Sequence, residues 1–116
     1  MQDIVRLSVL FDYYGAVLTE KQADICDMYF NQNLSLSEIS EITGITRQGV
    51  RDSLKKSEKI LSVHEEKLGI YEKDLKVSDL IGKIDSLLDG ADIESELKSG
   101  IKKITEQISS IKISPP

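Results

Sequence analysis

The sequence is poor in the residues that interrupt helices. Its two prolines are Pro115 and Pro116, at the extreme C-terminus, and it has few β-branched runs with an alternating pattern. Proline and strict alternation are the main sequence signals against helix, so their scarcity predicts an all-α fold. The chain has 116 residues, enough for one domain or for one small domain with a helical extension.

Cysteine and histidine are equally scarce. The single cysteine, Cys26, cannot form an intramolecular disulfide, which is typical of a reducing compartment. No histidine is near it in sequence, so we interpret it as a buried apolar residue and not as a reactive thiol. The only histidine, His64, continues an apolar stripe and is interpreted as a packing residue. The sequence contains no glycine-rich phosphate loop, no metal-ligand spacing and no nucleophile with a nearby base. We therefore predict that the protein is not an enzyme and has no cofactor, catalytic residue or metal site.

Long apolar runs are missing as well. The apolar segments are far shorter than the ~20 residues of a membrane-spanning helix. Asp3 and Arg6 stand where a secretory signal would have a basic segment and an apolar core. We therefore predict no membrane span and a cytoplasmic location.

Helical periodicity predicts a first domain over residues 1–68 with four helices. The first runs from about Asp3 to Tyr14, and the second begins at Thr19 and ends before residues 31–33. The third begins at Ser35, and the fourth runs from Thr46 as far as Leu68. Thr19 with Gln22, and Ser35 with Glu38, have the spacing of capping boxes. The expected inner faces are Ile25, Cys26, Met28 and Tyr29 in the second helix, Leu36, Ile39 and Ile42 in the third, and Val50, Leu54, Ser57 and Leu61 in the fourth.

The third and fourth helices form a predicted helix-turn-helix. Such helices pack closely only if the contact position is small, as Ser40 is, and Gly44 allows the left-handed turn. Thr46 can then cap the fourth helix. The residues expected to meet beneath the turn are Ile39, Ile45, Val50 and Leu54.

A second domain, a C-terminal helical pair, is predicted over residues 69–116. Gly69 is the expected stop, and Gly90 separates the two helices. Gly82 and Gly100 lie inside these helices, and each costs about 1 kcal/mol relative to alanine. Neither helix should therefore be stable alone. The pair must bury its apolar stripes on each other, on the N-terminal half, or on a second subunit as a homodimer. The stripes are Leu75, Leu80, Ile81, Ile84, Leu87 and Leu88, and then Ile93, Leu97, Ile101, Ile104, Ile108 and Ile111, the second close to a coiled-coil seam.

Charge is distributed unevenly. The net charge is −5, yet residues 46–60 carry five basic and two acidic side chains. Residues 1–45 carry two basic and seven acidic ones. One basic helix therefore stands in an acidic chain, and any affinity for DNA should be modest and sensitive to salt.

Counting 100° per residue places the polar side chains of the fourth helix on its outer face. Gln48 could pair with adenine and Arg51 with guanine, whereas the lysines suit phosphates. Asp52 in the middle of this face would repel phosphate. A solvated surface with ion pairs such as Asp52–Lys56 explains the same residues, so the residues alone leave both interpretations open. The candidate nucleic-acid or partner-binding residues are Arg47, Gln48, Arg51, Lys55, Lys56 and Lys59.

Residues 10–61 resemble the YlxM family, small bacterial helix-turn-helix proteins associated with the signal recognition particle. The matching pieces are "LFDYYG", "LTEKQ", "LSLSEI" and "TRQGV…D"; the last three also resemble the DNA-binding region 4 of sigma factors. Gly49 stands where the family usually has alanine, and the sequence after Gly69 diverges.

The resemblance implies a regulatory role in the signal recognition particle pathway, with the particle's GTPase or its RNA as the partner. The alternative is a sequence-specific DNA-binding transcription regulator, which would need a dimer to set the spacing of its half-sites. A purely structural role in an assembly is a third interpretation.

Overall fold

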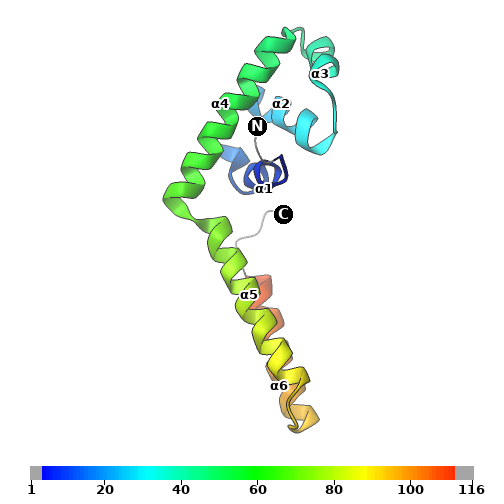
Figure 1. Ribbon diagram of the computed structural model, residues 1–116, viewed down its shortest axis with the longest axis vertical. Coiled ribbons are helices and arrows are strands. Elements are labelled where there is room, and N and C mark those ends of the chain that lie inside the picture. The colour runs from blue at the N-terminus through cyan, green and yellow to red at the C-terminus, as the bar shows by residue number, and fades with distance from the viewer. Residues whose placement is uncertain (1–3, 112–116) are drawn as a thin grey trace. The chain divides into compact units, whose positions relative to one another are not determined.

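The computed structural model describes residues 4–111, and in this part of the chain it is helical without a strand (Figure 1). The predicted all-α fold is confirmed. A 3₁₀ turn, Gly15–Val17, and a π-helical turn, Asp27–Asn31, accompany the α-helices. The α-helices are α1 Ile4–Tyr14, α2 Glu20–Cys26, α3 Leu36–Thr43, α4 Arg47–Leu68, α5 Ile70–Asp89 and α6 Ser95–Ser110. The chain forms two compact units, which divide between Gly69 and Ile70.

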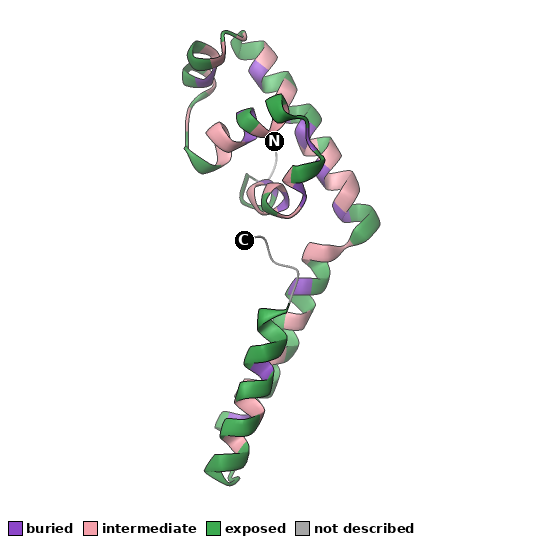
Figure 2. Ribbon diagram, turned by 180° about the vertical axis from the view of Figure 1, so that it is seen from behind, coloured by how far each residue is buried: buried purple, intermediate pink, exposed green. Residues whose placement is uncertain are grey.

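The first unit is organised around α4, against which α1, α2 and α3 all pack (Figure 1). Figure 2 shows the buried positions of α4 recurring along one side of the helix. The predicted inner face of α4 is confirmed, since Val50, Leu54, Ser57 and Leu61 are all buried. The apolar residues that complete this core are Leu7, Leu10, Tyr14, Leu18, Ile25, Cys26 and Ile39.

The predicted inner faces of the two short helices are partly wrong. Ile42 is 61% exposed, because α3 has only eight residues and its contact with α4 is filled by Ile39 and the half-buried Leu36. Met28 and Tyr29 are only half-buried. They lie in the π-helical turn, which widens the helix and rotates both side chains away from the line set by Ile25 and Cys26.

His64 packs in the first unit, as the sequence predicted. Its ring centre lies 6.1 Å from that of Tyr14, and its Nδ1 lies 2.8 Å from the carbonyl oxygen of Ile60. The helix then ends at Gly69, whose φ of 62° is in the left-handed region that favours glycine.

The second unit is a helical hairpin of α5 and α6. Leu88 and Thr105 are buried in it, and Lys102 Nζ reaches Asp89 Oδ1 at 3.0 Å. Of the three predicted ways to bury the long apolar stripes, contact between α5 and α6 accounts for few of their members. Leu87 is 75% exposed and Leu97 is 56% exposed, so each stripe lies largely outside the contact between α5 and α6.

Candidate functional site

The turn between α3 and α4 has the geometry of a helix-turn-helix. Gly44 has a φ of 75°, and the Ser40 hydroxyl donates a hydrogen bond of 2.5 Å to the carbonyl of Ile45. Thr46 then caps α4, its hydroxyl oxygen accepting from the N–H of Gly49 at 3.0 Å. Each contact fixes a backbone group that a helix end would otherwise leave unpaired, so the entry angle of α4 is rigidly set.

A capping box holds the other end of α3. The Ser35 N–H donates to Glu38 Oε1 at 3.0 Å, and the Glu38 N–H donates to Ser35 Oγ at 3.1 Å. The hydrogen bonds from the backbone and side chain of Ser35 hold the pKa of the Glu38 carboxyl below its usual range. The capping boxes predicted at Ser35 and at Thr19 are both present.

Thr43 fills a position where helix-turn-helix motifs usually have a larger apolar residue. Its hydroxyl donates to the carbonyl of Ile39 at 2.8 Å and accepts from the N–H of Ile45 at 3.3 Å. The side chain therefore ties the last turn of α3 to the turn itself. This polar contact replaces the apolar packing that the motif usually provides.

Gly49 allows a close approach inside the same motif. A Cβ atom at this position would lie 2.6 Å from Cγ2 of Ile45 and 3.1 Å from Oγ1 of Thr46. The glycine therefore lets the Ile45 side chain lie directly against the first turn of α4. Helix α4 nevertheless begins at Arg47 without irregularity.

The predicted binding residues all lie on α4 and are all exposed. Among residues 4–111, no carboxylate forms a salt bridge with any of the basic residues in this set. The structure therefore leaves a row of cations on the first half of α4, which we call the basic face. Its members are Arg47, Arg51, Lys55, Lys56 and Lys59, with Gln48 among them.

Asp52 is held by a neighbour on the same face. The Gln48 Nε2 donates to Asp52 Oδ1 at 2.9 Å, so the amide spans one turn of α4. Within the described part of the chain, the Asp52–Lys56 ion pair that a purely solvated surface would use does not form. The lysine therefore stays available for another anion.

A hollow beside the basic face was missed from the sequence. Its lining comes from four segments that are far apart along the chain, so no local motif marks it. It has a volume of about 200 Å³ and is lined by Ile4, Tyr29, Leu36, Arg51, Leu54 and Lys55.

The described residues hold neither a candidate metal-ligand cluster nor a candidate membrane-spanning helix. Between Ile4 and Ile111, no group of three His, Cys, Asp or Glu side chains is placed to hold a metal ion. No described helix combines the length and the hydrophobicity that crossing a membrane requires.

The fold and the turn geometry together define a helix-turn-helix protein. Residues 1–107 match the family model UPF0122, described as "Putative helix-turn-helix protein, YlxM / p13 like", and the chain belongs to this family. It is 42% identical over 108 residues to a UPF0122 protein of Thermoanaerobacter sp. strain X514, covering 91% of this chain and 90% of the relative. A UPF0122 protein of Desulforamulus reducens is 39% identical over 103 residues, which cover 89% of this chain and 87% of that relative. A relative from Caldanaerobacter subterraneus subsp. tengcongensis is 48% identical over 82 residues, which cover 71% of this chain and 70% of that relative.

Proposed function

We propose that this protein is a non-enzymatic, cytoplasmic binding protein whose basic face contacts the RNA of the signal recognition particle, and that it regulates the particle's pathway. The observation that carries the proposal is the row of exposed cations on α4. They have no salt-bridge partner among the described residues, so their charge is available to phosphates.

The acidic remainder of the chain limits how this face can bind. The net charge is −5, so the attraction to phosphate is confined to a narrow strip. A narrow strip suits a short contact with a folded RNA better than a long track along a duplex. The choice of the particle's RNA rests on the resemblance to the YlxM family, in which association with this particle is the expected role.

A pull-down with separated components tests the proposal. The particle's RNA and its GTPase are immobilised separately, and retention of the chain is measured at low salt. Reversing two charges of the basic face, Arg51→Glu with Lys55→Glu, should abolish retention on the RNA. The matched control is Lys76→Glu with Lys83→Glu on α5, which makes the same charge change at two lysines that have carboxylate partners.

Each outcome decides between the candidate partners. Loss of RNA retention in the α4 variant alone supports the proposal. Retention on the GTPase but not on the RNA would show that the partner is a protein. Retention on neither component would overturn the assignment to the particle.

The second candidate is the sequence-specific DNA-binding regulator, which the intact turn favours. In this structure the Gln48 amide is engaged with Asp52, so pairing with adenine would require that hydrogen bond to break. Selection from random duplex DNA at moderate salt tests this candidate. An enriched motif supports it, and weak binding that disappears with added salt counts against it.

We also propose that the chain forms a homodimer through α5 and α6. At 3.6 residues per turn, most of the exposed apolar side chains, though not Leu75, fall on one flank of each helix. Because the two helices run antiparallel, both flanks lie on the same side of the hairpin. This hairpin apolar face consists of Leu80, Ile84, Leu87, Leu97, Ile104 and Ile108.

The exposure of this face fits a second copy. Its side chains are 38–75% exposed, and contiguous exposed apolar patches of this kind often mark protein–protein contacts. The spacing of Leu97, Ile104 and Ile108 also matches a helical bundle, and the partner's own hairpin supplies two helices of this kind.

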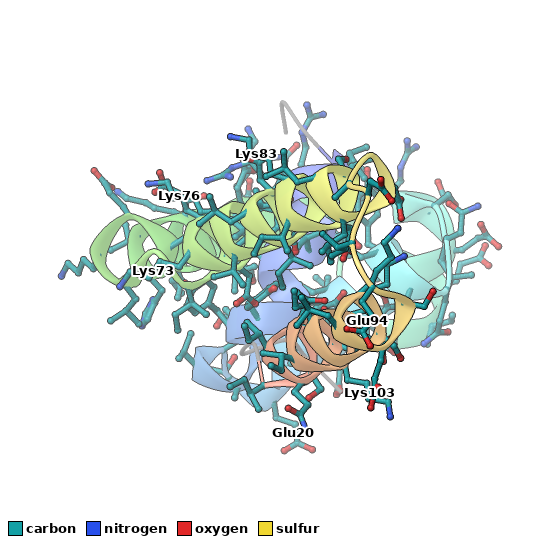
Figure 3. The ribbon with its side chains drawn as sticks, turned by 90° about the horizontal axis from the view of Figure 1, so that it is seen from below. Glu20, Lys73, Lys76, Lys83, Glu94 and Lys103 are labelled. Carbon is teal, nitrogen blue, oxygen red and sulfur yellow. The ribbon has the colours of Figure 1, made fainter. Side chains whose placement is uncertain are left out.

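Sedimentation measures the oligomeric state directly. The wild-type chain should sediment as a dimer at micromolar concentration, and Leu97→Glu with Ile104→Glu should sediment as a monomer. Lys103→Glu is the control, because this side chain points from α6 away from α5 (Figure 3). A wild-type chain that stays monomeric throughout the micromolar range would overturn the dimer.

A further inference from the structure

The hollow beside the basic face is a site that neither the helix-turn-helix motif nor the row of cations explains. Four segments meet around it: the start of α1, the π-helical turn, the start of α3 and the first half of α4. Leu54 is 2% exposed and forms its floor, while Arg51 and Lys55 stand exposed at its border. We call it the Tyr29 hollow, after its one aromatic side chain.

Tyr29 is brought to the hollow by an irregular backbone. The π-helical turn Asp27–Asn31 ends with a hydrogen bond of 3.1 Å from the Gln32 N–H to the Asp27 carbonyl, one residue wider than in an α-helix. The Asp27 carboxylate holds this turn together by accepting from the side chains of Asn31 at 2.7 Å and Gln32 at 2.9 Å. These hydrogen bonds also lower the pKa of Asp27. Turns of this type occur often at functional sites.

The ring of Tyr29 contacts that of Phe30 and also lines the hollow. Its centre lies 5.4 Å from that of Phe30 in an edge-to-face arrangement, and the tyrosine is half-buried. A partly open aromatic ring against aliphatic walls offers a stacking surface to a flat, apolar group. A volume of about 200 Å³ has room for one nucleobase and none for a base pair.

The two cations at the border add charge to this apolar site. Arg51 and Lys55 are four residues apart, so they lie one above the other on α4. Among the described residues, neither has a carboxylate partner. An aromatic and aliphatic hollow next to two available cations is the combination that proteins use for an unpaired nucleotide, with its base stacked and its phosphate paired.

We propose that the Tyr29 hollow holds the base of one unpaired nucleotide while Arg51 and Lys55 bind the adjoining phosphates. The inference rests on the proposed contact between the basic face and RNA, and it adds the feature of the RNA that is recognised. A bulged or looped nucleotide, and not a continuous duplex, is then the preferred ligand.

Fluorescence anisotropy with three synthetic RNA hairpins tests the hollow. One hairpin carries a single-nucleotide bulge, the second has an abasic site at the bulge, and the third is fully paired. Stacking of one base predicts that the bulged hairpin binds about 5-fold to 100-fold more tightly than the other two. Tyr29→Ala should remove this preference, and Tyr29→Phe, which keeps the ring, should retain it.

A second variant covers the case in which Tyr29→Ala fails to fold. Tyr29→Leu puts an aliphatic side chain in place of the ring, so it removes the stacking surface while keeping an apolar residue at this position. It should remove the preference for the bulge and leave binding to the paired hairpin unchanged. Circular dichroism confirms that each variant is folded.

The outcomes separate the two proposals. If no hairpin binds the wild-type chain at low salt, the proposed contact with RNA fails. If all three bind equally and neither Tyr29→Ala nor Tyr29→Leu changes their affinities, the contact with RNA stands and the hollow is not a nucleotide site.

Discussion

The Tyr14 hydroxyl donates a hydrogen bond of 2.6 Å to Oε1 of Glu65 and joins α1 to α4 across 51 positions of the sequence. Both residues are buried, at 5% and 6% exposure. A buried hydrogen bond is costly to lose, because removing its donor takes one partner away from an oxygen that water does not reach. The bond holds the end of α4 that lies farthest from the helix-turn-helix. Its donor, Tyr14, is the last residue of α1.

Tyr14→Phe should therefore destabilise the first unit. The variant removes the hydroxyl donor while keeping the ring, and the expected loss is about 1–3 kcal/mol in the free energy of unfolding. Urea unfolding followed by circular dichroism measures it. Glu66→Gln is the control, because Glu66 is exposed next to Glu65 and should change stability by less than about 0.5 kcal/mol. An equal effect of the two substitutions would contradict the role given to the buried bond.

The capping box of α3 should depend on pH. The pKa of Glu38 is lowered in the folded chain, so its contribution is fully present above the pKa of the unfolded chain. That contribution is lost as the pH falls through the lower, folded value. A titration of the Ser35 amide by NMR should show a midpoint below the ordinary value for glutamate, and Glu38→Gln should remove this transition. A midpoint at or above the ordinary value would show that the carboxylate is not held by Ser35.

Replacing Ser57 should stabilise the protein, in contrast to Tyr14→Phe. It is 1% exposed in the core, and within the described residues its hydroxyl has no hydrogen-bond partner. The neighbouring Cys26 thiol has its pKa raised by burial and, to a smaller extent, lowered by an interaction with the Ser57 hydroxyl, but sulfur is a weak hydrogen-bond acceptor and does not satisfy that hydroxyl. Ser57→Ala should stabilise the protein by about 1 kcal/mol, since a buried hydroxyl without a partner is unfavourable. Ser62→Ala on the same helix is the control, because it corrects for the difference in helix propensity between serine and alanine. A net loss of stability in Ser57→Ala would show that the Ser57 hydroxyl is paired.

Two glycines should respond oppositely to the same substitution. Gly44 has a φ of 75°, so Gly44→Ala places a side chain in the left-handed region, at a cost of about 1–2 kcal/mol. Gly82 lies inside α5 with open space around its missing Cβ, so Gly82→Ala should stabilise that helix by up to about 1 kcal/mol. Thermal unfolding of the two variants measures the difference. If Gly44→Ala proved neutral, the turn would have to reach the same geometry without the left-handed residue.

Local signals in the sequence predicted the helices and their caps, because a cap or a left-handed turn depends on residues three or four positions apart. The capping boxes at Thr19 and Ser35 and the turn at Gly44 are of this kind. Burial was predicted less well, since it depends on what an element packs against. Ile42 has the spacing of an inner residue, but α3 is too short to bury it. The π-helical turn at Tyr29 and the hollow beside it have no local pattern, and only the folded chain brings Leu36 and Lys55 together.

The salt dependence of RNA binding should reveal which cations touch phosphate. Each contact with a phosphate contributes about 0.7 to the slope of log K against log salt for a single strand and about 0.9 for a duplex. Lys59 lies on the basic face without a salt-bridge partner among the described residues, so Lys59→Gln should lower the magnitude of the slope by nearly one. Lys83→Gln on α5, where the lysine is paired with Asp79 at 3.3 Å, should leave the slope unchanged. If Lys59→Gln lowers the affinity but leaves the slope unaltered, Lys59 lies outside the phosphate contacts. Equal changes of slope in Lys59→Gln and Lys83→Gln would show that binding responds to net charge and not to the basic face.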